Sequence, residues 1–272
     1  MSTLALILIA TAALCAGFAA IYAVARRMNN YGIVDIAWSY AFGALAIFYA
    51  FAAGGWAPRR FLIAAIAFVW SLRLGTHLYI RVIGHHPEED GRYQEMRKHR
   101  AANFAQKMIV FYQQQAVSVV ILGLPFLLIA RNPAPRLYPL EIVGAALWLI
   151  AIIGESTADT QLKTFKKNPS NKGKVCDTGL WSLSRHPNYF FEWCIWIAYF
   201  VFACASPWGW LSVICPAAML YLLLHVTGIP MTEEQSIRSR SDAYRDYQRR
   251  VSAFVPWFPT KTRSQKSDAS RQ

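Results

Sequence analysis

Long apolar runs separated by short polar segments are the feature that most constrains how this chain can fold. The hydrocarbon core of a bilayer is ~30 Å thick, so a helix that rises about 1.5 Å per residue needs roughly 20 residues to cross it. Runs of about that length occur at residues 4–24, 34–53, 61–80, 108–130, 139–158, 188–205 and 208–226. The pattern predicts an all-α integral membrane protein of about seven transmembrane helices, the last two joined by a tight turn at Ser206-Pro207.

Composition supports a membrane protein. Of the 272 residues, 55% are hydrophobic and only 16% are charged, whereas about a quarter of a soluble domain is charged. The first run lacks a basic leader and a small-residue cleavage site and continues to Val24, so we expect a retained helix and not a signal peptide. We predict one membrane-embedded domain at residues 1–259 and a disordered polar tail at 260–272.

Basic residues are in excess and gather on one side of the predicted bundle. The net charge is +13, from 28 Lys+Arg against 15 Asp+Glu. They lie mainly in the loops after the third and fifth runs and in the tail: Arg81, Arg92, Arg97, Lys98, Arg100 and Lys107; Lys163, Lys166, Lys167, Lys172, Lys174 and Arg185; Arg238, Arg240, Arg245, Arg249, Arg250, Lys261 and Arg263. Because positive loops stay in the cytoplasm, we predict an outer N-terminus and a cytoplasmic C-terminus. The placement favours a membrane surface or a phosphate-bearing ligand over nucleic acid.

Polar residues also fall inside the apolar runs, where a charge costs a few kcal/mol and tends to face the bundle interior. Asp35 opens the second run, and others share single helix faces: Arg73, His77 and Arg81; Glu155 and Asp159; Asn188 and Glu192. One interpretation is a polar ligand cavity at the cytoplasmic end. The alternative is that these side chains reach toward headgroups, or that Asp35 pairs with an arginine of the third run such as Arg73.

Two local motifs indicate anion binding. Arg185 and His186 precede Pro187, which suits the first turn of a helix, so basic side chains and free N–H groups meet there as a phosphate requires. The tail sequence at residues 244–250 places two tyrosines and three arginines on a short helix, which could alternatively bind headgroups. No glycine-rich nucleotide motif occurs, so a nucleotide would be held by the bundle. The five cysteines form no C-x-x-C pair, and we expect no metal site.

The residues carry a family resemblance over nearly the whole chain. It rests on Val34-Asp35-Ile36-Ala37-Trp38, Trp70-Ser71-Leu72-Arg73-Leu74, Glu89-Asp90-Gly91-Arg92-Tyr93, Asp159-Thr160-Gln161-Leu162, Arg185 to Glu192 and Tyr244 to Pro256. The chain resembles the membrane reductases grouped with steroid 5α-reductase, in their bacterial branch. That resemblance implies a seven-helix bundle of the bacterial inner membrane. NADPH would enter the bundle from the cytosol, and a lipidic enone would enter it from the bilayer. The Arg185–Tyr189 block also resembles isoprenylcysteine carboxyl methyltransferases, which bind S-adenosylmethionine, but the earlier motifs favour the reductases.

The resemblance also implies roles for residues. By position Asp35 matches a carbonyl-activating glutamate, which works only if the carboxyl is protonated, as burial would favour. Trp70 falls where the reductases carry a tyrosine, and Tyr79 is a possible substitute donor. The resemblance places Arg73, Asp159, Asn188 and Glu192 on the nicotinamide and ribose. Lys163, Lys166, Arg185 and the tail arginines suit the phosphates. The full implied cofactor set adds Arg81, Arg92, Tyr93, His186, Tyr189, Tyr244, Arg245, Tyr247 and Arg249.

The expected function is therefore NADPH-dependent reduction of a conjugated C=C bond in a sterol-like or isoprenoid lipid by a monomeric membrane enzyme. Two alternatives stay open. One is an S-adenosylmethionine-dependent methyltransferase that acts on a lipid-linked carboxylate. The other is a lipid-binding or scaffold protein without enzymatic activity.

Overall fold

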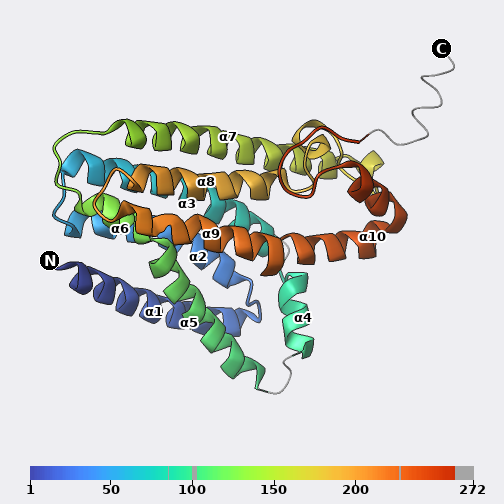
Figure 1. Ribbon diagram of the computed structural model, residues 1–272. Coiled ribbons are helices and arrows are strands. Elements are labelled where there is room, and N and C mark those ends of the chain that lie inside the picture. The colour runs from blue at the N-terminus through green and yellow to red at the C-terminus, as the bar shows by residue number, and fades with distance from the viewer. Residues whose placement is uncertain (85, 100–102, 227, 261–272) are drawn as a thin grey trace, which may run out of the picture. The chain divides into compact units, whose positions relative to one another are not determined.

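The computed structural model describes residues 1–84, 86–99, 103–226 and 228–260, so the predicted disordered tail lies, except for Thr260, outside the described residues. The regular elements of the described residues are helices joined by loops, with one isolated bridge between Ser184 and Ser252. Figure 1 shows the elements in order: α1 (Thr3–Met28), α2 (Ile33–Ala52), α3 (Ala57–Ile83), α4 (Gly91–His99), α5 (Phe104–Leu122), α6 (Leu124–Arg131), α7 (Pro139–Lys167), η1 (Pro169–Asn171), η2 (Gly179–Ser182), α8 (Pro187–Ala203), η3 (Gly209–Val213), α9 (Ile214–Tyr221), η4 (Leu222–Val226) and α10 (Ile229–Arg250). The all-α prediction is confirmed.

The described residues include six helical stretches that are long and apolar enough to cross a bilayer: Thr3–Met28, Ile33–Ala52, Ala57–Ile83, Phe104–Arg131, Pro139–Lys167 and Gly209–Arg250. The chain therefore has the helices of a multi-pass membrane protein. α8 begins at Pro187 as predicted but has only 17 residues. The count of seven spans and the orientation stay predictions.

Three boundaries differ from those expected. The fourth run is divided at Gly123, where α5 ends and α6 begins. Pro125 lies in the first turn of α6, and it is tolerated there because residues of the first turn do not donate an N–H within the helix. α7 continues past the predicted end at residue 158 to Lys167, since helical hydrogen bonds do not stop where apolar side chains do. The last run is a mixture of η3, α9 and a π turn at η4, and it leads into α10.

The chain divides into two compact units. The first comprises residues Met1–Val143 and Tyr199–Cys215. In it α2 packs along α3 and α1 packs against α5 (Figure 1). The helix contact between α2 and α3 requires a small residue at Gly75, because a Cβ atom there would lie 2.6 Å from the ring of Tyr40.

A buried ion pair lies in the first unit, at the N-terminal end of α3. The side chains of Arg59 and Glu141 are both fully buried and form a two-point salt bridge. Arg59 also donates to the carbonyl oxygens of Asn132, at 3.1 Å, and Ala134, at 2.7 Å. Glu141 in turn accepts the N–H of Tyr138 at 2.7 Å. The loop between α6 and α7 is thereby fastened to α3.

The second unit comprises residues 144–198 and the chain from Pro216 onward. The ring of Phe191 on α8 lies directly over Gly154 of α7, where a Cβ atom would collide with it. The indole N–H of Trp181 donates to the carbonyl of Ala158 at 2.9 Å, which joins the loop before α8 to α7. α10 is kinked at Ser241, whose φ of 40° and ψ of −112° are not helical.

Candidate functional site

The first polar centre is built around Asp35, in the first turn of α2. Its Oδ1 accepts the hydroxyl of Tyr93 at 2.8 Å, and its Oδ2 accepts Nη2 of Arg92 at 2.7 Å. Nη2 of Arg81, at the end of α3, lies 3.9 Å from the same oxygen. Arg92 also donates from Nε to Asp90 at 3.1 Å, and Arg81 lies 3.4 Å from Asp90. Two carboxylates and two guanidinium groups thus alternate beside one phenol.

The electrostatics of this centre keep its donors protonated. Burial is the main reason that the pKa of Tyr93 is well above its usual value, and the nearby Asp35 carboxylate raises it further. Burial alone would lower the pKa of Arg92, but Asp35, Tyr93 and Asp90 raise it overall. Burial would likewise raise the pKa of Asp90, and Arg92 outweighs that effect and lowers it. At neutral pH the centre presents a phenolic O–H and a guanidinium cation to the Asp35 carboxyl group.

Of the predicted catalytic residues besides Asp35, one is buried in the protein and the other is exposed. Trp70 is fully buried and packs against Phe42 and Tyr199, with ring centroids 5.4 and 6.1 Å away. Tyr79 is 51% exposed on α3. The alternative of an ion pair with an arginine of the third run is met by Arg81, whose Nη2 lies 3.9 Å from Oδ2 of Asp35. Arg92 and Tyr93, predicted to contact a cofactor, are the residues that bond to Asp35.

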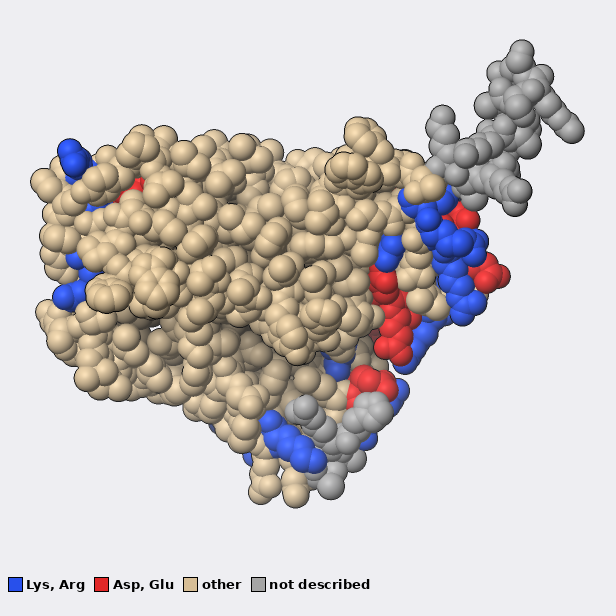
Figure 2. All heavy atoms as spheres, in the orientation of Figure 1, with Lys and Arg blue, Asp and Glu red and all other residues tan. Residues whose placement is uncertain are grey.

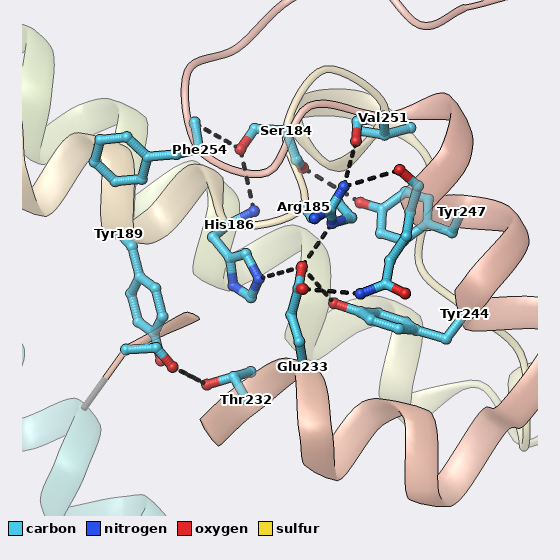
Figure 3. Close-up of polar contacts among 12 residues, drawn as sticks. Ser184, Arg185, His186, Tyr189, Thr232, Glu233, Tyr244, Tyr247, Val251 and Phe254 are labelled. Atoms are coloured by element: carbon cyan, nitrogen blue, oxygen red, sulfur yellow. Dashed lines mark hydrogen bonds and ion pairs between the residues drawn. The ribbon is translucent and has the colours of Figure 1, made fainter. Parts of the chain in front are cut away.

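The second polar centre is built around Glu233 on α10 (Figure 3). Its Oε1 accepts Nε of Arg185 at 2.6 Å and lies 3.3 Å from Nε2 of His186. The hydroxyl of Tyr244 donates to Oε1 at 3.5 Å, and the amide of Gln248 donates to Oε2 at 2.8 Å. Four side chains from two segments distant in sequence therefore converge on one carboxylate.

The same centre joins the C-terminal end of α10 to the loop before α8. Nη1 of Arg185 donates to the carbonyl oxygens of Gln248, at 3.0 Å, and Val251, at 2.7 Å. Tyr247 is buried, and its hydroxyl donates to the carbonyls of Trp181 and Ser184. Arg185 and Tyr247 thus satisfy backbone carbonyls that would otherwise be buried without a donor.

His186 is buried between this carboxylate and an aromatic ring. Its imidazole stacks on Tyr189, with centroids 5.4 Å apart and planes 7° from parallel. The hydroxyl of Tyr189 is hydrogen-bonded to Thr232 at 3.1 Å. Burial is the main reason that the pKa of His186 is lowered, although Glu233 acts in the opposite direction. The ring is therefore neutral near physiological pH.

The other predicted cofactor residues of the second unit differ in how far they are exposed to the surroundings. Lys163, Lys166, Arg245 and Arg249 are exposed. Asn188, at the start of α8, donates to Asp159 of α7 at 3.3 Å, so two residues that were each predicted to contact the cofactor are bonded to each other. Glu192 is buried and accepts the indole N–H of Trp196 at 3.0 Å. Figure 2 shows charged side chains of both signs gathered over the C-terminal part of α10.

Sequence reasoning missed Glu233 and left Asp90 without a role. Glu233 follows the helix start at Gly228-Ile229-Pro230 by one turn, and the acidic pair that it forms with Glu234 before the basic part of α10 was the available signal. Asp90 belongs to the motif Glu89-Asp90-Gly91-Arg92-Tyr93, but the sequence did not indicate which residues it contacts. Among the described residues no group of three or more His, Cys, Asp or Glu side chains could hold a metal ion.

These features define a multi-pass helical membrane protein with a polar centre in each of its two units. The chain belongs to the family described as protein of unknown function (DUF1295), whose profile matches residues 21–251 and which is related to steroid 5α-reductase-like proteins. It is also 43% identical over 51 residues to the "Probable O-methyltransferase ustE" of Ustilaginoidea virens, a match that covers 19% of this chain and 18% of that protein. No solved structure matches. The resemblance drawn from the sequence is confirmed at the level of this family.

Proposed function

We propose that this protein reduces a conjugated C=C bond in a lipidic enone with NADPH as the hydride source. The observation that carries the proposal is the Asp35 centre, where Tyr93 and Arg92 are held at 2.8 and 2.7 Å from one carboxyl group. Addition of hydride to the β carbon of an enone places negative charge on the carbonyl oxygen. Hydrogen-bond donors fixed near that oxygen lower the barrier.

The geometry favours donors other than Asp35 itself. Both carboxyl oxygens of Asp35 already accept hydrogen bonds, so the group acts as an acceptor that orients its neighbours. Tyr93 keeps its proton at neutral pH because its pKa is raised. The side chain of Arg81 is 43% exposed, so a ligand can approach it. We assign Arg81 and Arg92 as oxyanion donors, Asp35 as the residue that positions them, and Tyr93 as the proton source, whose O–H must turn from Asp35 to the substrate oxygen when the substrate binds.

The second unit has the donor set that a phosphorylated dinucleotide requires. Lys163 and Lys166 lie three residues apart on α7 and so share a helix face, and both are exposed. With Arg245 they suit the pyrophosphate and the 2′-phosphate. The Asn188–Asp159 pair offers both an amide and a carboxylate to a carboxamide or a ribose hydroxyl. When bound, the reduced nicotinamide would supply the hydride.

A second candidate function is methyl transfer from S-adenosylmethionine to a lipid-linked carboxylate. The partial match to a probable O-methyltransferase favours it. Methylation of a carboxylate oxygen needs no acid at a carbonyl group, so the Asp35 centre would then have a structural role alone. The two functions therefore differ in what a change at Asp35 or Tyr93 does to turnover.

Ligand binding to the purified protein distinguishes the functions. We expect NADPH to bind more tightly than NADH and S-adenosylmethionine not to bind, and NADPH to be oxidised only when a lipidic enone is added. Saturable binding of S-adenosylmethionine without binding of NADPH would favour methyl transfer. Binding of none of the three would favour a non-enzymatic role.

Variants of the Asp35 centre test the assignment of roles. Tyr93→Phe should lower turnover by about a hundredfold or more, as expected for loss of a general acid, with NADPH affinity unchanged. Asp35→Leu should abolish turnover, and Asp35→Asn, which can still orient a donor, should leave part of it. Tyr221→Phe makes the same change at a tyrosine that is 62% exposed and serves as the control. Full activity in a stable Asp35→Leu protein would remove this centre from the mechanism.

A further inference from the structure

Residues 252–258, near the end of the described part of the chain, form a strap whose backbone is hydrogen-bonded at several points. The carbonyl of Ser252 accepts the N–H of Arg185 at 2.8 Å. The hydroxyl of Ser184 donates to the carbonyl of Phe254 at 2.8 Å, and the N–H of Trp257 donates to the carbonyl of Leu183 at 2.8 Å. The strap is therefore fixed along the loop that precedes α8.

Large apolar side chains project from this fixed backbone into the surroundings. Val255 is 52% exposed, Trp257 is 70% exposed and Phe258 is 82% exposed. Pro256, between Val255 and Trp257, further restricts the backbone. A held segment that exposes three apolar side chains within four residues marks an interaction surface, since folding alone gives no reason to leave them uncovered.

The packing of Phe254 locates the strap at the boundary between apolar and charged chain. Its ring centroid lies 5.8 Å from that of Phe190 and 5.7 Å from that of Trp193, within the first two turns of α8. Phe254 also packs in one cluster with Leu223 and Ile229, where the apolar part of the last predicted span gives way to the charged α10. The strap therefore packs where the apolar part of the chain gives way to charged sequence.

The chemistry around the strap suits an anionic headgroup region. Arg249 near the end of α10 has 70% of its side chain exposed, and its ion pair with Asp246, at 3.3 Å, is itself on the surface. Tryptophan favours the membrane interface because its ring is apolar and its N–H is polar. Basic side chains next to it add attraction to anionic lipids.

We propose that Val255, Trp257 and Phe258 insert into the boundary between headgroups and acyl chains, and that Arg249 contacts anionic headgroups. The strap then anchors the C-terminal part of the second unit to the bilayer surface. Because the loop before α8 is bonded to the strap, the anchor also sets the depth of the Arg185–Glu233 centre. This inference does not depend on the proposed enzymatic function.

Fluorine NMR of the full chain labelled with fluorotryptophan tests the proposal. The protein is placed in nanodiscs of phosphatidylcholine and phosphatidylglycerol, and the Trp257 signal is assigned by its disappearance in Trp257→Phe. Lipids spin-labelled near the headgroup should cause loss of this signal. Trp196, which is fully buried in the protein and assigned with Trp196→Phe, should keep its signal.

A water-soluble gadolinium chelate separates the remaining outcomes. Loss of the Trp257 signal with spin-labelled lipid supports the anchor whether or not the chelate also broadens it, since the interface is open to water. Loss with the chelate alone would overturn the proposal by placing Trp257 in water. Retention with both reagents would also overturn it, because the side chain would then be covered by protein, such as a second copy of the chain.

Discussion

Replacing Arg185 with alanine should destabilise the second unit and leave the preference for NADPH over NADH unchanged. The sequence alone favours a phosphate contact for Arg185, which predicts the opposite result. The structure instead directs its Nε to Glu233 at 2.6 Å and its Nη1 to two backbone carbonyls at 3.0 and 2.7 Å. Because Nε and Nη1 of Arg185 already donate to acceptors of the protein, we expect this guanidinium to hold the fold together and not to bind a phosphate.

The size of the effect follows from the burial of the pair. The side chains of Arg185 and Glu233 are 11% and 15% exposed, and removal of one partner from a buried pair costs about 3–5 kcal/mol. Partial exposure lowers this figure, while the loss of a donor for two carbonyls offsets the reduction, so we expect about 3 kcal/mol. At roughly 2–4 °C per kcal/mol for a chain of this size, the melting temperature should fall by about 6–12 °C.

The assay measures thermal unfolding in detergent together with the affinities for NADPH and NADH on the same preparations. Lys163→Ala is the matched control, because Lys163 is exposed on α7. It should weaken NADPH binding selectively, by about 1–3 kcal/mol for a lost charge-assisted bond, without changing the melting temperature. An unchanged melting temperature in Arg185→Ala, with a selective loss of NADPH affinity, would refute the reasoning.

Three further predictions concern stability. Arg59→Met should cost about 3–5 kcal/mol because it leaves Glu141 buried without its cation, and an apolar replacement of both residues should restore most of that loss; unfolding of the single and double variants in detergent checks this. Stability should decrease as the pH falls below 6.5, the usual pKa of histidine, because the unfolded chain then takes up a proton that the buried His186, with its lowered pKa, resists. His186→Gln should flatten that pH profile, and a profile identical to that of the unchanged protein would contradict the role of His186. Gly154→Ala should cost about 1–3 kcal/mol by overpacking against Phe191, and recovery of the loss by Phe191→Leu in the same chain identifies the collision.

The position of the polar residues could be predicted from the sequence only in part. Arg73, His77 and Arg81 were expected on one helix face, and they do lie on the continuous helix α3. The pairing of Asn188 with Asp159 agrees with their expected proximity. The partners of Asp35 were not predicted, because Arg92 and Tyr93 are separated from it by more than fifty residues and reach it only when α4 packs near α2.

What the sequence determined by itself is the class of structure. Apolar runs of membrane length fix the backbone as helical, since a bilayer leaves no other way to satisfy the N–H and C=O groups within one segment. The start of α8 at Pro187 is equally local, because it depends on the φ angle of a single residue. Such features require no knowledge of distant contacts.

What only the tertiary structure decided is which charges are used inside the protein. Arg185 and Arg59 read in the sequence as basic residues of loops, yet each is bonded to a carboxylate far along the chain, Glu233 in one case and Glu141 in the other. The sequence shows a charge but not the carboxylate that folding brings to it. Because a guanidinium is either paired and buried or free to meet a ligand, its role is set by that long-range contact and not by its local sequence.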